Sequence, residues 1–154
     1  MTCKHLIALP LLLLLCFSTA VSSQDKLGHL KSWDGKPTQE VDEKGKITSD
    51  FFALPEIRTP LQRLLSRRDY NLVIKTYSVG APLKLMGEFL ATSMCRPHNC
   101  GDERAGFAIN LSTGVIYVRM QKGTKERWFV SEGKASELPT EVQDYIGNPA
   151  KKQS

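Results

Sequence analysis

The chain has 154 residues, a formal net charge of +5, 41% hydrophobic residues and 24% charged residues. This composition is typical of a globular protein, and the length suits one ordinary domain once an export segment has been removed. It excludes a multidomain enzyme, a protein that crosses the membrane several times, and a small scaffold held together mainly by disulfides.

Residues 1–23 have the three parts of a secretory signal peptide: a charged start at Lys4, an apolar run over residues 6–17, and small residues after it. The run is too short to cross a hydrocarbon core roughly 30 Å thick as a permanent helix. Lipid attachment at Cys16 is the alternative, but Leu15 stands where a small residue usually precedes a lipidated cysteine. We predict export to the periplasm, removal of this segment and no membrane span.

Residues 24–47 are polar and charged, and glycines and a proline interrupt them. Such a composition is typical of an extended or partly disordered arm, because it offers too little apolar surface to fold alone. Leu30 and Trp33 are the two side chains suited to anchor it on the main body. We therefore divide the chain into the signal peptide, a polar arm over residues 24–47 and a single domain over residues 48–150.

The first helix of the domain is predicted to begin with Thr59 as its N-cap and Pro60 at its first helical position. Apolar residues then recur at i, i+3 and i+4, which is the spacing of one helix face. These apolar positions are Leu61, Leu64 and Leu65. Arg67 and Arg68 fall in the predicted last turn, where positive charge suits the helix dipole.

After this helix the hydrophobic period changes from 3.6 to 2, which is typical of strands. Alternation predicts strands at residues 72–77, 83–94, 105–111, 115–120 and 127–131. Short turns join the last three strands, and a closing helix follows from Thr140 to Gly147. Because no long crossover separates the strands, we predict an α+β fold with a central antiparallel sheet of about five strands and helices packed on one face.

Removal of the signal peptide leaves two cysteines, Cys95 and Cys100, in an oxidising compartment where such a pair is expected to form a disulfide. In the chain-entropy model so small a ring adds only about 2 kcal/mol to global stability. Its main effect is to restrict the residues inside it, and Pro97 fixes one more backbone angle there. The ring therefore presents His98 with little conformational freedom left to lose on binding.

The residue types inside the ring indicate a partner with an acidic groove. A protonated imidazole donates hydrogen bonds from both of its nitrogens. His98 therefore suits a cleft lined by two carboxylates, with one donor for each. Arg96, directly before Pro97, adds a second cationic donor.

The ring resembles the signature loop of the Ivy family, the periplasmic inhibitors of vertebrate (C-type) lysozyme, which reads Cys-Lys-Pro-His-Asp-Cys. The positions that match are Cys95, Pro97, His98 and Cys100, followed by a fitting Gly101. Arg96 replaces the lysine, and Asn99 stands in place of the aspartate. Asparagine keeps the size and one acceptor of aspartate but loses its charge. By the order of its elements, the resemblance covers residues 50–147.

The resemblance implies an α+β fold, often dimeric, whose loop enters the lysozyme cleft and blocks it without being cut. By this interpretation the lysozyme-binding residues are Arg96, Pro97, His98 and Asn99, and the disulfide joins Cys95 to Cys100. His98 would contact the two catalytic carboxylates of the enzyme. The protein would be an inhibitor and not an enzyme, and it would need neither a cofactor nor a metal. Its partner would be a C-type lysozyme, with a bacterial lytic transglycosylase as the alternative target, and a homodimer is expected.

Other functions fit these residues less well. A thiol–disulfide protein is a second hypothesis, but Cys95 and Cys100 lack the Cys-x-x-Cys spacing. A metal site would lack a fourth ligand, because the only other histidine after the signal peptide is His29. A carbohydrate-binding module is a third hypothesis, although its aromatic residues are expected to pack in the sheet. These residues are Tyr117, Trp128 and Phe129.

The charged residues argue against a nucleic-acid partner and leave the ring as the main determinant of binding. Basic residues are scattered along an exported chain, which is not the footprint of a nucleic-acid site. Asp102 and Glu103 directly follow a turn, so we expect both to be solvated. The exported chain is basic, as C-type lysozymes are, so affinity must come from short-range contacts at the ring.

Overall fold

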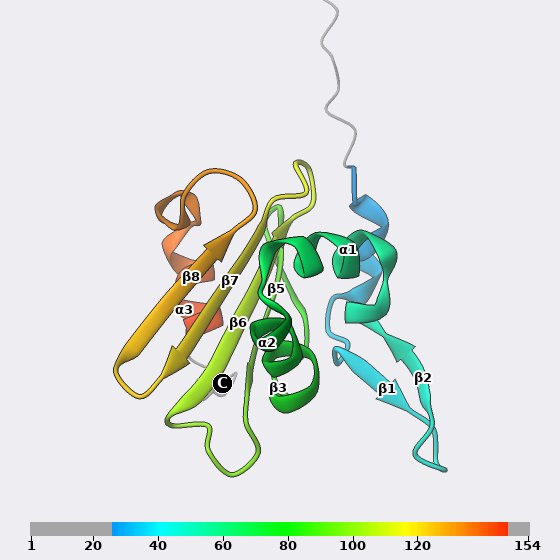
Figure 1. Ribbon diagram of the computed structural model, residues 1–154. Helices are drawn as coiled ribbons and strands as arrows, with labels where there is room; N and C mark the ends of the chain where they lie inside the picture. The colour runs from blue at the N-terminus through cyan, green and yellow to red at the C-terminus, as the bar shows by residue number, and fades with distance from the viewer. Residues whose placement is uncertain (1–25, 148–154) are drawn as a thin grey trace, which may run out of the picture.

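The computed structural model describes residues 26–147, which form an antiparallel sheet with helices on both of its faces (Figure 1). The predicted signal peptide, residues 1–23, lies outside the described residues. Between residues 26 and 147, none of the helices has the length and apolar character needed to cross a membrane.

The sheet has six strands in the order β3-β5-β6-β7-β8, with β4 also paired to β5. The strands are β3 (Val79–Gly80), β4 (Lys84–Met86), β5 (Phe89–Cys95), β6 (Glu103–Asn110), β7 (Ile116–Lys122) and β8 (Lys125–Val130). Every pairing in it is antiparallel, because turns and short loops connect the strands. The predicted α+β class with a central antiparallel sheet is confirmed.

The long strand predicted over residues 83–94 is instead a hairpin of β4 and β5. Met86 pairs with Phe89 across a two-residue turn that contains Gly87. Gly87 has a φ of 60°, a conformation that glycine adopts without strain and that tight hairpin turns require. The alternating apolar pattern continues through the turn, so it did not reveal the break.

Residues 28–64 contain a two-stranded hairpin and three short helices. These are η1 (Gly28–Trp33), β1 (Gln39–Val41), β2 (Ile47–Asp50), η2 (Phe51–Ala53) and α1 (Pro55–Leu64). Both predicted anchors of the polar arm pack on the body: Leu30 is fully buried, and the Trp33 ring lies edge-on against Phe51, 5.4 Å between centroids. The Phe51 ring in turn packs edge-on against Phe107 of β6.

Helix α1 begins earlier than predicted, at Pro55 and not at Pro60. Pro55 takes the first helical position, to which proline is well suited because the N–H of that position has no helical partner. Pro60 lies inside the helix, where its missing N–H removes one backbone hydrogen bond. Ile57 and Leu61 are fully buried, and their packing holds the helix together across this gap.

A strand was predicted over residues 72–77, but residues 72–76 are helical. Helix α2 (Arg67–Asn71) starts the segment and η3 (Leu72–Thr76), a π-helical turn, continues it. Ser66 caps α2, since its Oγ accepts a hydrogen bond from the N–H of Asp69 at 3.1 Å. Asp69, Val73 and Tyr77 are buried at i, i+4 spacing, which is a helical face. The prediction was wrong because the cap and this buried stripe outweigh the alternation around Val73.

The hydrophobic core lies on both faces of the sheet, so the predicted packing of all helices on one face is wrong. Phe107 and Ile109 face η1, η2 and α1, whereas Ala108 between them faces the opposite side. There α3 (Thr140–Gly147) covers the sheet with Val142 and Ile146, preceded by η4 (Ala135–Glu137) (Figure 1). Small residues on this face of β5 and β6 allow the helix to approach closely.

Gly106 marks the closest approach of α3 to β6. A Cβ added there would lie 2.2 Å from the carbonyl oxygen of Ile146, so backbone would have to move. We expect Gly106→Ala to lower the free energy of unfolding by about 1–3 kcal/mol, measured by urea denaturation. Gly101→Ala is the matched control, because nothing lies within 4 Å of its added Cβ. Equal unfolding midpoints for the two variants would contradict this account of the packing.

Candidate functional site

The loop between β5 and β6 projects beyond the end of the sheet (Figure 1). A disulfide joins Cys95, the last residue of β5, to Cys100, with 4.9 Å between their Cα atoms. Cys95 is buried, whereas Arg96 and His98 are exposed. The ring therefore begins at a buried cysteine, and its turn carries His98 away from the sheet.

The chain inside the ring forms a tight turn that determines the conformation of His98. The N–H of Asn99 donates to the carbonyl of Arg96 at 3.0 Å, with Pro97 and His98 as the two central residues. His98 has a φ of 62° and is the only non-glycine residue of the described chain with a positive φ. Proline followed by a residue of positive φ is the pattern of a type II turn. A non-glycine residue is disfavoured in this backbone conformation in a free peptide. The closed ring therefore helps to hold His98 in it.

The imidazole of His98 is available to a partner from outside the chain. Within residues 26–147 it makes no hydrogen bond and no ion pair. Asn99 contributes instead through its backbone, because its carbonyl accepts from the N–H groups of Asp102 at 3.2 Å and Glu103 at 3.0 Å. The residue at the acidic position of the motif thus closes the base of the ring with main-chain bonds that do not depend on a charge.

Backbone hydrogen bonds attach the base of the ring to the sheet on two sides. The N–H of Arg96 donates to the carbonyl of Glu103 at 3.0 Å, which extends the pairing of β5 with β6 by one step. The N–H of Gly123, in the turn between β7 and β8, donates to the carbonyl of Asp102 at 2.8 Å. These bonds leave the turn around His98 as the part of the loop that projects freely.

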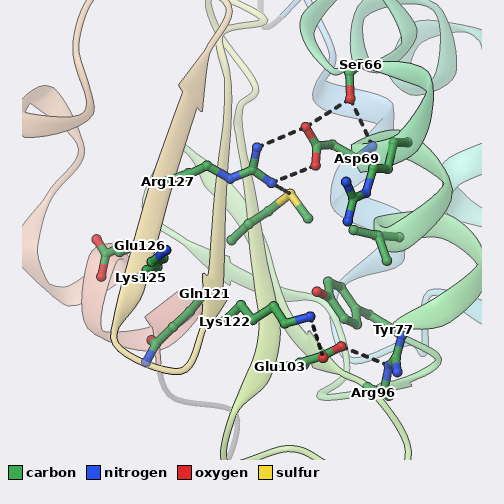
Figure 2. Close-up of a pocket in the computed structure, with 13 residues that line it drawn as sticks. Ser66, Asp69, Tyr77, Arg96, Glu103, Gln121, Lys122, Lys125, Glu126 and Arg127 are labelled. Carbon is green, nitrogen blue, oxygen red and sulfur yellow. Dashed lines mark hydrogen bonds and ion pairs between the residues drawn. The ribbon is translucent and has the colours of Figure 1, made fainter.

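A row of three charged side chains crosses the strands directly behind the ring. Glu103 lies opposite Lys122 in the register of β6 and β7 and opposite Arg96 on its other side. The Nε of Arg96 is 2.9 Å from one carboxylate oxygen of Glu103, and the Nζ of Lys122 is 3.3 Å from the other (Figure 2). The expectation that Glu103 is solvated is wrong, because only 8% of the residue is exposed.

A pocket of about 790 Å³ opens beside this row, between α2–η3 and the ends of β7 and β8 (Figure 2). Across it Arg127 binds Asp69 with two hydrogen bonds, of 2.6 and 3.2 Å, and the Ser66 hydroxyl donates to the same carboxylate at 2.9 Å. The Arg127 hydrogen bonds hold the pKa of the Asp69 carboxyl below its usual 3.8, against the opposite effect of burial. Burial, followed by the charge of Glu103, raises the pKa of Tyr77 in the pocket wall.

The three carboxylates that line the pocket all bind cations of neighbouring elements. Asp69 binds Arg127, and Glu103 binds the two cations described above. Glu126 binds Arg119 at 2.6 Å, and this hydrogen bond lowers the pKa of Glu126. These acids hold the helical segment and the strands together, so the arrangement is suited to presenting a rigid surface more than to transferring protons.

The other residues singled out from the sequence have structural positions. Tyr117 is buried under α3, and the indole N–H of Trp128 donates to Glu126. The guanidinium of Arg127 lies over the ring of Phe129, 5.2 Å from its centroid. His29 contacts Glu56 of α1 at 2.7 Å. Because the two sulfurs of the ring are bonded to each other, they are not thiolate ligands for the metal site considered above.

Sequence reasoning missed Glu103, Lys122 and Gly123 as parts of the site. Glu103 and Lys122 become neighbours only through the register of β6 and β7, and Gly123 reaches Asp102 only through the turn that follows. The available signal was an acidic residue two positions before one predicted strand and a lysine two positions after the next. Paired antiparallel strands bring such positions together.

The ion pair of Asp69 and Arg127 predicts a pH-dependent contribution to stability. A carboxyl whose pKa is lower in the folded state stabilises the fold above its unfolded pKa, about 4, and this contribution is lost as the pH falls further. We expect Asp69→Asn to lower the free energy of unfolding by about 1 kcal/mol at pH 7, because Arg127 is half exposed and solvent screens the pair. The difference should shrink at about pH 3, measured by urea denaturation.

Asp102→Asn is the control for this experiment, because Asp102 is exposed and outside the ion pair. Its unfolding midpoint should match that of the unmodified chain at both pH values. An Asp69→Asn deficit of the same size at low and neutral pH would contradict the role assigned to the ion pair.

Residues 56–152 match the protein family described as inhibitor of vertebrate lysozyme (Ivy). The match spans more than half of the chain and includes all but the first residue of α1, together with α2, the six-stranded sheet, the ring and α3. No curated protein and no solved structure matches the chain.

Proposed function

This chain belongs to the Ivy family, the inhibitors of vertebrate lysozyme, and we propose that it blocks the active-site cleft of a C-type lysozyme with its disulfide ring. The observation that supports this mechanism best is the exposed imidazole of His98, which has no partner between residues 26 and 147 and sits on a tight turn at the end of the sheet. The binding segment comprises Arg96, Pro97, His98 and Asn99.

The chemistry of the cleft suits this histidine. Lysozymes hold two carboxyl groups on either side of the glycosidic bond that they cleave. A protonated imidazole has two N–H donors that point in different directions, so His98 alone provides a donor for each carboxyl group. The ring offers a peptide turn in place of a glycosidic bond. The enzyme is therefore occupied without a bond that it can cleave.

Preorganisation supplies affinity that long-range charge does not. The full chain has a formal net charge of +5, of which residues 1–23 contribute only Lys4. C-type lysozymes are also basic, so the association is not steered by opposite charges. The disulfide and the hydrogen bond from Asn99 to Arg96 hold His98 in its positive-φ conformation before binding. A side chain that is ordered beforehand loses less conformational entropy in the complex.

His98→Ala tests this mechanism. The substitution removes both donors from the centre of the proposed interface, where single side chains contribute most of the binding free energy. We expect a loss of about 2–4 kcal/mol of binding free energy, measured as the inhibition constant against a C-type lysozyme acting on bacterial cell walls. His29→Ala, which removes the other exposed histidine of the folded chain, should inhibit as well as the unmodified protein. Undiminished inhibition by His98→Ala would reject the mechanism.

Removal of the disulfide tests whether the ring serves inhibition or only the stability of the fold. In the Cys95→Ala/Cys100→Ala variant we expect a loss of about 2 kcal/mol in the free energy of unfolding, because the ring is small. Inhibition should weaken by about tenfold or more, because the freed turn must be ordered again on binding. Urea denaturation and the inhibition constant provide the two measurements. If the variant stays folded and inhibits normally, the ring is only a structural link.

The family's inhibitors are periplasmic, and we place this chain in the same compartment, with residues 1–23 removed on export. Mass spectrometry of the protein from the periplasmic fraction measures this directly, and a chain that retains Lys4 would contradict it.

A homodimer is the assembly expected from the family, and sedimentation of the exported chain measures it. Neither property is needed for the ring to enter a cleft.

Two alternatives use the same ring. A lytic transglycosylase also cleaves peptidoglycan with an acidic residue in its cleft, and stronger inhibition of such an enzyme than of lysozyme would identify it as the target. A thiol–disulfide protein would reduce insulin with turnover, whereas a rigid inhibitor ring would not. The disulfide between near neighbours at the end of a strand is the feature that keeps this second alternative open to test.

A further inference from the structure

We infer that Glu103 is a positioning residue for the inhibitory ring and that Arg96 acts through Glu103 and not on the target enzyme. This inference rests on the proposed function of the ring. It assigns a role to a carboxylate outside the ring motif and changes the role first given to Arg96. It follows from the row of three charged side chains, Arg96, Glu103 and Lys122, next to the ring.

The side chain of Arg96 turns back toward the body of the protein. Its Nε lies 2.9 Å from one oxygen of Glu103, while the Nζ of Lys122 lies 3.3 Å from the other oxygen. Figure 2 shows the two cations reaching this carboxylate from opposite sides. Each oxygen therefore has its own cation, and one carboxylate connects the ring, the start of β6 and the end of β7.

Burial makes Glu103 the fixed member of this row. Its side chain is 11% exposed, against 44% for Arg96 and 77% for Lys122. A buried carboxylate is unfavourable unless it is paired, whereas the two exposed cations are hydrated whether or not they bind it. The buried carboxylate is therefore the fixed partner, and it holds the guanidinium of Arg96 in place.

The anchored residue is the one that begins the turn of His98. The carbonyl of Arg96 accepts the hydrogen bond that closes the turn, and two residues later His98 has its φ of 62°. Such a conformation persists only where the surrounding structure holds it. Fixing the side chain of Arg96 limits rotation of the peptide that carries this carbonyl. Loss of Glu103 would free one arm of the turn and raise the entropic cost of ordering His98 on binding.

A double-mutant cycle distinguishes this role from direct contact with the target. We compare Glu103→Gln, Arg96→Gln and the double variant by their inhibition constants against a C-type lysozyme. If Arg96 acts through Glu103, each single variant should weaken inhibition by about tenfold, and the double variant should be no weaker than either. If Arg96 contacts the enzyme itself, the two effects should multiply.

Asp69→Asn is the matched control. Asp69 is also a buried carboxylate that binds an arginine across the pocket, but its ion pair joins α2 to β8 and does not include the ring. We expect Asp69→Asn and Glu103→Gln to lower the melting temperature by similar amounts. Only Glu103→Gln should weaken inhibition. The backbone order parameters of residues 96–99, measured by NMR on the free protein, should fall in Glu103→Gln and stay unchanged in Asp69→Asn.

Normal inhibition by Glu103→Gln, or multiplied effects in the double variant, would overturn the inference while leaving the function of the ring in place. Failure of the proposed function gives a different result. Either the unmodified chain does not inhibit lysozyme, or His98→Ala inhibits it as well as the unmodified chain. In that case the order parameters decide the inference alone. Unchanged mobility of residues 96–99 in Glu103→Gln would overturn it, and increased mobility confined to that variant would support it.

Discussion

Seven residue pairs join β5 to β6 in antiparallel register, from Phe89 opposite Asn110 to Cys95 opposite Arg104. This pairing brings the two ends of the projecting loop together, because the chain leaves the sheet beside the point where it returns. It also sets which side chains face the pocket. A slip of one residue in this pairing would take Arg96 out of its place opposite Glu103. The register of β6 and β7 places Lys122 opposite the same residue, so the support of the ring follows from two strand registers.

The packing of the core, and not the ring, stabilises the fold. Core side chains fill both faces of the sheet, with η1, η2 and α1 on one side and α3 on the other. The small disulfide adds little to global stability. Its main effect is to hold one residue in an unfavourable backbone conformation. His98 occupies that position at the tip. Such a division suits the proposed function, since the turn proposed to bind lysozyme is carried by a body whose core does not depend on it.

The carboxylates near the ring hold elements together. Asp69 joins α2 to β8, Glu103 joins the ring to β6 and β7, and Glu126 joins neighbouring positions of β8 and β7. Hydrogen bonds from arginines lower the pKa of Asp69 and of Glu126. The imidazole of His98, in contrast, has no such partner within residues 26–147. This difference supports the proposal that His98, and not one of these acids, contacts the target of an inhibitor of the Ivy family.

Local sequence determined the ring, the hairpins of β6 to β8 and the closing helix, because the residues that form each of them lie within a few positions of one another. Tertiary structure decided the rest. The alternation at residues 72–77 is typical of a strand, but the burial of Asp69 and Tyr77 on one helical face favours a helix. The burial of Glu103 depended on Lys122, a neighbour only across paired strands. The side that α3 covers depended on the small residues opposite it. Contacts between distant positions are created by register and burial, and a local pattern does not contain either.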